Sequence, residues 1–179
     1  MQPSPTTLAY LAGMIDGDGY ISVTRSVRDG KEYFGAQVGI AGTRREPHDL
    51  AASIWGGKVS CHRPKNPLHR PQFQWSRVGA SAVVVIEAII PYLLVKQDHA
   101  CLALDLHDCV IMAKYEDAFP WFGPDFDPLA AMRRMREEMI EANQSRSRAG
   151  KKAAGRLLDG RTWDEFPARA DASKERVGR

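Results

Sequence analysis

The chain has 179 residues and a net charge of only +3, from 25 basic and 22 acidic side chains. This length allows one domain with a buried core, and no apolar run approaches the roughly 20 residues that a membrane-spanning helix needs. Residues 1–5 lack the features of a secretory signal, and three cysteines without CxxC spacing fit a reducing compartment. We therefore expect neither a membrane protein nor a secreted one.

The charge is unevenly distributed along the chain. Residues 20–78 carry ten Lys and Arg against four Asp and Glu, a net +6, whereas residues 79–132 carry a net −6. Residues 133–179 contribute +5, and Asp16 and Asp18 alone contribute −2 near the N-terminus. Two basic segments fit either a solvated surface or a polyanionic partner.

The first predicted element is a helix through Leu8–Ile15. Its N-cap is expected at Thr6 or Thr7, and Gly17 or Gly19 is expected to end it with a positive φ. Three small residues let another backbone approach this helix closely: Ala9, Ala12 and Gly13. They indicate either an ordinary buried helix or a contact with a second chain.

Alternation with period 2 then predicts four strands. The first hairpin spans about Ile21–Ile40 around a turn at Asp29-Gly30, and a short helix is expected over Asp49–Trp55. The second hairpin pairs Lys58–Arg63 with Gln72–Val78. Four of its side chains are predicted to face the core: Val59, Cys61, Phe73 and Trp75.

After Ala80 the pattern returns to helix, breaks at Pro91 and resumes over about Lys96–Met112. The order αββαββα predicts an α+β fold, a four-stranded antiparallel sheet with helices on one face and a polar opposite face. Another helix is expected over Leu129–Asn143. We divide the chain into a core at 1–115, a C-terminal helical extension at 116–143 and a basic tail at 144–179 that we expect to be flexible.

The segment Leu11–Gly19 carries the most informative chemistry. It places the carboxylates of Asp16 and Asp18 at the C-terminal end of a helix, where the helix dipole disfavours anions. A divalent cation would reverse this cost, since carboxylate and carbonyl oxygens are ligands that Mg²⁺ prefers.

This segment resembles the LAGLIDADG motif of the homing endonucleases, and the resemblance extends from about Leu8 to Met112. The identical positions are Leu11, Ala12, Gly13, Ile15, Asp16, Asp18 and Gly19, with conservative changes at Met14 and Gly17. The resemblance implies the αββαββα homing-endonuclease fold with a saddle-shaped sheet. A single motif copy implies a homodimer whose motif helices pack together through Ala9, Ala12 and Gly13.

The resemblance also implies roles for site residues. Asp18 matches the metal-binding, catalytic acid, and Gly17 the position that supplies a backbone carbonyl ligand. Asp16 is either a metal ligand or a structural residue at the helix end. Lys96 matches a basic residue near the scissile phosphate, or is a surface lysine.

A second polar position of the family's active site, often a Gln on the second strand, falls on Gly39 or Ile40. Neither of these residues can position water. We predict that the nearby basic pair Arg44-Arg45 takes this catalytic role instead, with Arg44 as the better positional match.

The implied activity is site-specific hydrolysis of both strands of a long pseudo-palindromic duplex DNA, with Mg²⁺ or Mn²⁺ as cofactor, in intron homing. The predicted DNA-binding residues are Ser22, Thr24, Ser26, Arg28, Tyr33, Gln37, Lys58, Ser60, His62, Arg70, Gln72 and Gln74, whose side chains suit base-edge and phosphate contacts. We expect a cytoplasmic protein of prokaryotic or phage origin, or an organellar one.

Other functions are open at this point. The same scaffold can serve as a non-catalytic binder, either an RNA maturase for introns or a DNA-binding regulator. A general metal-binding module leaves the +6 segment at residues 20–78 unexplained.

Overall fold

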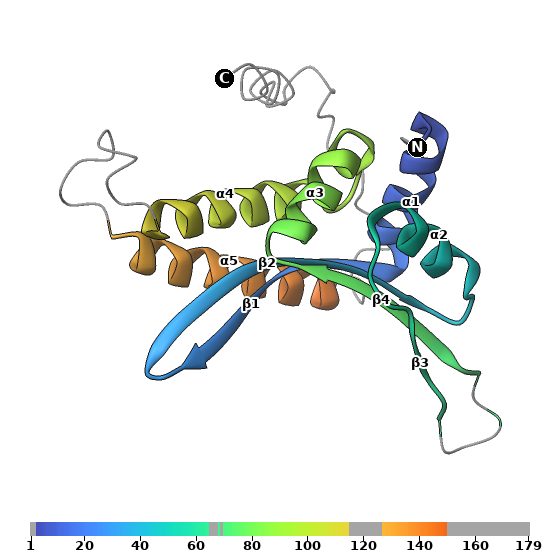
Figure 1. The fold of residues 1–179 in the computed structure, drawn as a ribbon, viewed down its shortest axis with the longest axis horizontal. Coiled ribbons are helices and arrows are strands. Elements are labelled where there is room, and N and C mark those ends of the chain that lie inside the picture. Colours follow the sequence, from blue (N-terminus) through green and yellow to red (C-terminus); the bar gives the residue numbers. More distant parts are fainter. Residues whose placement is uncertain (1–2, 65–67, 69, 115–126, 150–179) are drawn as a thin grey trace. The chain divides into compact units, whose positions relative to one another are not determined.

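The computed structural model describes residues 3–64, 68, 70–114 and 127–149, with side chains to residue 144. The elements are, in chain order, α1 (Pro5–Asp18), β1 (Gly19–Arg28), β2 (Lys31–Gly42), α2 (Glu46–Trp55), β3 (Ser60–His62), β4 (Gln72–Val78), α3 (Ala80–Ile89), the 3-10 turn η1 (Ile90–Tyr92), α4 (Gln97–Lys114) and α5 (Pro128–Ala149). The predicted α+β order is confirmed (Figure 1). The chain divides into two compact units, Met1–Ala142 and Asn143–Arg179, and the sheet belongs to the first.

The four strands form one antiparallel sheet in the order β1-β2-β4-β3. Asp29 and Gly30 join β1 to β2 with φ of 51° and 74°. Positive φ at both residues is the geometry of a two-residue hairpin turn, as Asp-Gly predicts. The resulting register pairs Gly19 with Ile40, so the end of α1 lies beside the second half of β2.

One face of the sheet packs on α1, α3 and α4 and forms the core. Its fully buried members include Leu11, Ile15, Ile21, Val38, Ile40, Trp75, Ile86 and Ile89. Trp75 links two layers, because its indole N–H donates to the carbonyl of Gly56 at 2.8 Å and its ring lies 5.9 Å from that of Trp55. No helix in the described part of the chain combines the length and apolar character needed to cross a membrane.

Both ends of α1 differ from the prediction. The N-cap is Ser4, not Thr6 or Thr7, since the Ser4 hydroxyl accepts from the backbone N–H of Thr7 at 3.2 Å. Gly19 ends the helix with an extended φ of −98°. Glycine is needed at position 19 because there is no room for a side chain. A Cβ there would lie 2.5 Å from the carbonyl oxygen of Gly39 and 2.6 Å from Cα of Ile15.

Gly19→Ala should therefore lower the free energy of unfolding by about 3 kcal/mol, because backbone atoms on both sides must move apart. The matched control is Gly42→Ala on β2, where a Cβ would meet only the His48 ring at an ordinary 3.7 Å. Its effect should stay under about 1 kcal/mol in urea unfolding. Equal effects of the two substitutions would refute the close approach.

Three further predictions need correction or fall outside the description. Cys61 shares a face with Phe73 but is exposed, because β3 is an edge strand that extends beyond the helices (Figure 1). The last helix continues to Ala149, past its predicted end at Asn143. Residues 116–126 of the predicted extension and 150–179 of the predicted tail lie outside the described residues.

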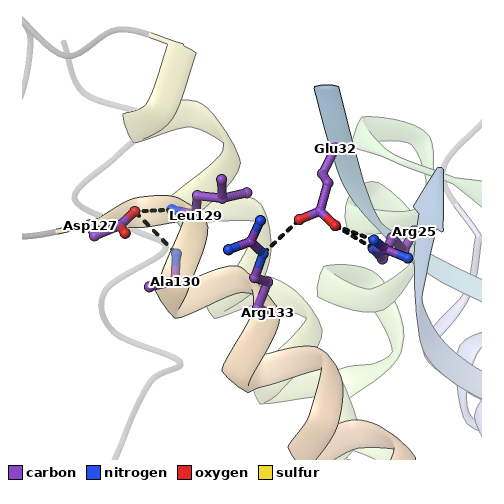
Figure 2. Close-up of polar contacts among 6 residues, drawn as sticks. All are labelled: Arg25, Glu32, Asp127, Leu129, Ala130 and Arg133. Atoms are coloured by element: carbon purple, nitrogen blue, oxygen red, sulfur yellow. Dashed lines mark hydrogen bonds and ion pairs between the residues drawn. The ribbon is translucent and has the colours of Figure 1, made fainter. Parts of the chain in front are cut away.

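The first turns of α5 are attached to the hairpin of β1 and β2. Glu32 forms ion pairs with Arg25 of β1 and with Nε of Arg133 of α5, the latter at 2.6 Å (Figure 2). Asp127 caps the helix, as its carboxylate accepts from two backbone N–H groups at 2.9 and 3.1 Å. Beneath these contacts, Met132 packs in a second apolar cluster.

The hydrogen bond from Arg25, and then that from Arg133, lower the pKa of Glu32 below its ordinary value. A lowered pKa means that the contact stabilises the fold above the ordinary carboxyl range and is lost as pH falls through the lowered pKa. Glu32→Gln should therefore reduce the melting temperature near neutral pH, and the difference from wild type should shrink in acid. The exposed Glu87→Gln serves as control, and a pH-independent difference would contradict the assignment.

Candidate functional site

Asp18 is the last residue of α1, exposed at the point where the helix ends and β1 begins. Gly17 is also exposed, and a Cβ built on it meets nothing within 4 Å. The helix dipole adds negative potential at this end. The end of α1 is therefore an open, electronegative position.

The preceding carboxylate, Asp16, is bound to backbone. Its two oxygens accept from three consecutive N–H groups, those of Leu94 at 2.6 Å, Val95 at 3.1 Å and Lys96 at 2.9 Å. These residues connect η1 to α4, so Asp16 ties that connection to α1. Of the two roles predicted for Asp16, these contacts favour the structural one.

Lys96 links the same two segments through its side chain, which contacts the backbone of α1. Its ammonium donates to the carbonyl oxygens of Ile15 at 2.7 Å and Asp16 at 2.5 Å. The last carbonyls of a helix lack partners within the helix, and a cation there also interacts favourably with the dipole. We call the contacts of Asp16 and Lys96 the helix-end clamp. It holds the backbone directly before Gly17 and Asp18.

Asp16→Ala should lower the free energy of unfolding by about 3 kcal/mol, because three backbone N–H groups lose a charged acceptor. Asp18→Ala should change it by less than about 0.5 kcal/mol, since an exposed anion is removed from the C-terminal end of a helix. Paired chemical denaturation measures both. A larger cost for Asp18→Ala would reverse the assigned roles.

The register places every predicted DNA-facing strand residue on one face of the sheet, opposite the core. Ser22 pairs with Gln37, Ser26 with Tyr33 and Arg28 with Lys31. On the other hairpin Gln74 pairs with Ser60, and Gln72 with His62. Thr24 shares this face, and its hydroxyl donates to the carbonyl of Gly35 at 3.0 Å. We call this surface the polar face; Lys58 and Arg70 are exposed just outside its strands.

Tyr20 belongs to the polar face but is absent from the predicted set. Its hydroxyl accepts from the side-chain amides of Gln37 at 3.4 Å and Gln74 at 3.2 Å. Tyr20 starts the same alternation that continues with Ser22 and Thr24, and this pattern was a signal for including it. It follows Asp18 by two residues and so lies at the motif end of the face.

The structure places the predicted second-strand position beside the motif. Ile40 pairs with Gly19 and is fully buried, whereas Gly39 pairs with Tyr20 on the polar face. Arg44 is exposed in the connection between β2 and α2, four residues beyond the pairing with Gly19. Its catalytic role stays a prediction.

The exposed face of α1 differs in one residue from the predicted interface. Ala12 is fully buried within the chain, because its side of the helix packs on the core, so it is not accessible to a second chain. Ala9 and Gly13 are exposed, together with Tyr10. A Cβ built on Gly13 meets nothing within 4 Å, which leaves this face open.

Asp18 and the carbonyl of Gly17 suit a hard divalent cation, but one chain supplies few ligands. Within the described residues, no three His, Cys, Asp or Glu side chains are close enough to hold one metal ion together. Mg²⁺ is usually bound through one or two carboxylates, with waters and substrate phosphates as the other ligands. The donors at the end of α1 fit this mode and no closed metal cage.

No protein-family model and no curated protein matches the chain. Solved structures, in contrast, match the chain. The homing endonuclease I-CvuI in complex with its target is 20% identical, with 86% of this chain and 97% of that chain covered and a TM-score of 0.56. The archaeal intron-encoded homing endonuclease I-Vdi141I in complex with DNA is 11% identical, with coverages of 76% and 84% and a TM-score of 0.58.

The match to the meganuclease I-SmaMI bound to DNA covers a smaller share of that chain. I-SmaMI is 14% identical with a TM-score of 0.56, and the match covers 76% of this chain but 45% of that chain. These likenesses show that the chain has the homing-endonuclease fold. The resemblance to the LAGLIDADG homing endonucleases is thus confirmed in the fold.

Proposed function

We propose that the chain is a site-specific DNA endonuclease that acts as a homodimer, depends on a divalent metal ion and cuts both strands of a pseudo-palindromic target. The observation that carries this proposal is the exposed Asp18 at the end of α1, held by the helix-end clamp beside the polar face. A structural acid would be expected to make contacts of the kind that Asp16 makes. An exposed carboxylate next to a hydrogen-bonded helix end suits a metal ligand instead.

Two observations support a role for two chains, the small number of metal ligands in one chain and the fold comparison. Two copies that pack α1 against α1 would bring two Asp18 carboxylates together, which suits metal-assisted hydrolysis. The match to I-SmaMI also covers less than half of that chain, so that protein has room for a second unit of this size. A symmetric dimer implies a target with matching two-fold symmetry.

The chain's own residues would divide the work between binding and hydrolysis. The polar face would lie in the major groove, with Arg28 and Lys31 at the far end of the hairpin. Asp18 and the Gly17 carbonyl would hold a metal ion, Mg²⁺ or Mn²⁺, which when bound supplies charge stabilisation and an activated water. Lys96, anchored on the carbonyls of Ile15 and Asp16, would add positive charge near the scissile phosphate.

Asp18→Asn should abolish cutting and preserve DNA binding. Removing a preorganised stabilising group from a transition state costs about a hundredfold or more in rate. A duplex selected from a random pool is incubated with wild type or D18N in Mg²⁺ or EDTA, and products are separated on denaturing gels. Cutting by D18N at the wild-type rate would exclude Asp18 as the metal ligand.

Binding of a selected duplex without cutting, in every metal tested, would contradict the nuclease. It would indicate the alternative predicted above, a non-catalytic DNA-binding regulator on this scaffold. Selective binding of structured RNA would indicate the maturase.

Gly13→Leu should leave the fold intact and block dimer formation, because the new side chain projects from α1 into space that is open in the single chain. We expect unchanged circular dichroism, a monomer by light scattering and loss of double-strand cutting. Ala130→Leu, which adds the same exposed side chain to α5, is the control and should remain dimeric. A dimeric G13L protein would exclude this face as the interface.

A further inference from the structure

The Tyr20 side chain reaches across the polar face from β1 to β4. It starts on β1, opposite Gly39 of β2, and its hydroxyl meets the amide of Gln74 on β4 at 3.2 Å. Gly39 permits this path: a Cβ there would lie 2.7 Å from both the hydroxyl oxygen and Cζ of Tyr20. The phenol therefore occupies the place that a side chain at residue 39 would take.

Contacts with two side-chain amides limit the hydrogen bonds that the Tyr20 hydroxyl can make. Gln37 and Gln74 both donate to the phenolic oxygen, so the two acceptor positions of that oxygen are occupied. At its other end the Gln37 amide accepts from the Ser22 hydroxyl through Oε1, at 3.4 Å. Within the described residues nothing accepts the phenolic proton, so the group is a donor toward the open side of the sheet.

We propose that the Tyr20 hydroxyl reads a base near the centre of the target by donating a hydrogen bond in the major groove. This inference rests on the proposed function, since α1 marks the centre of the target only in a dimer on DNA. A glutamine side chain can donate or accept and can therefore adapt to several bases. In the observed arrangement Tyr20 accepts from both amides, so its own proton is what it offers to a base.

The chemistry of the groove then determines the preference. The major-groove acceptors are N7 of purines, O6 of guanine and O4 of thymine, whereas cytosine presents an amino donor. The DNA target should therefore carry guanine, adenine or thymine at the position that Tyr20 contacts, and cytosine should be excluded there. Gln37 and Gln74 act here as positioning residues, because they direct the proton of Tyr20.

The test selects duplexes from a randomised pool in EDTA, so that binding is measured without cutting. Wild type, Tyr20→Phe and the control Tyr92→Phe, a tyrosine of η1 outside the polar face, are compared by sequencing the bound DNA. We expect Y20F to lose the exclusion of cytosine at positions next to the centre and to keep the outer preferences. Its affinity for the wild-type target should fall about 3- to 10-fold, the scale of one lost hydrogen bond, while Y92F matches wild type.

Each other outcome overturns the inference in a distinguishable way. If Y20F selects the same sequences with wild-type affinity, Tyr20 reads no base and the proposed function is untouched. If Y20F weakens all positions equally and melts at a lower temperature, the hydroxyl is structural. If wild type enriches no sequence, the proposed function and this inference fail together.

Discussion

One carboxylate organises the end of the motif helix. Asp16 lies where an anion is electrostatically unfavourable, yet it is held by three consecutive backbone N–H groups from the connection before α4. The ammonium of Lys96, from the same connection, donates hydrogen bonds to the carbonyls of Ile15 and Asp16. These contacts join segments about eighty residues apart in sequence. The exposed position of Asp18 depends on them, since they fix the backbone two residues before it.

A second constraint acts just after Asp18. The backbone at Gly19 lies so close to the carbonyl of Gly39 that a Cβ would not fit between them. Therefore α1 ends directly against β2, and β1 starts in register with β2. The absence of a side chain at Gly39 also leaves room for Tyr20 on the polar face. Two glycines thus determine how closely the motif approaches the sheet. The clamp and this close approach together place an acidic helix end beside a polar surface that belongs to the basic part of the chain.

Periodicity and turn chemistry predicted most of the fold. Asp29-Gly30 predicted the first hairpin, the alternation from Ser22 predicted its polar face, and Pro91 predicted the break between α3 and α4. The functions of the glycines were harder to predict. Gly19 reads as a residue with positive φ, and only the packing shows that space is the reason. The exposure of Cys61 likewise depends on which strand forms the edge of the sheet.

The site was predicted in part. The family resemblance located Asp16, Asp18 and Lys96, but not the helix-end clamp, because hydrogen bonds between distant segments leave no local pattern. Ala12 shares the small size of Ala9 and Gly13, yet it faces the core, since size alone does not distinguish the two sides of a helix. The contacts of Tyr20 could not be predicted, because they depend on the missing side chain at Gly39 in the opposite strand, a pairing that only the register reveals.

The central claim is that two Asp18 carboxylates meet at a metal site on DNA. Anomalous diffraction from crystals of the chain bound to a selected duplex and grown with Mn²⁺ tests it most directly. The account predicts two copies of the chain on one duplex, with manganese peaks between the Asp18 side chains and the backbone phosphates. Peaks remote from Asp18, or a single copy that binds the duplex with its α1 exposed, would contradict it.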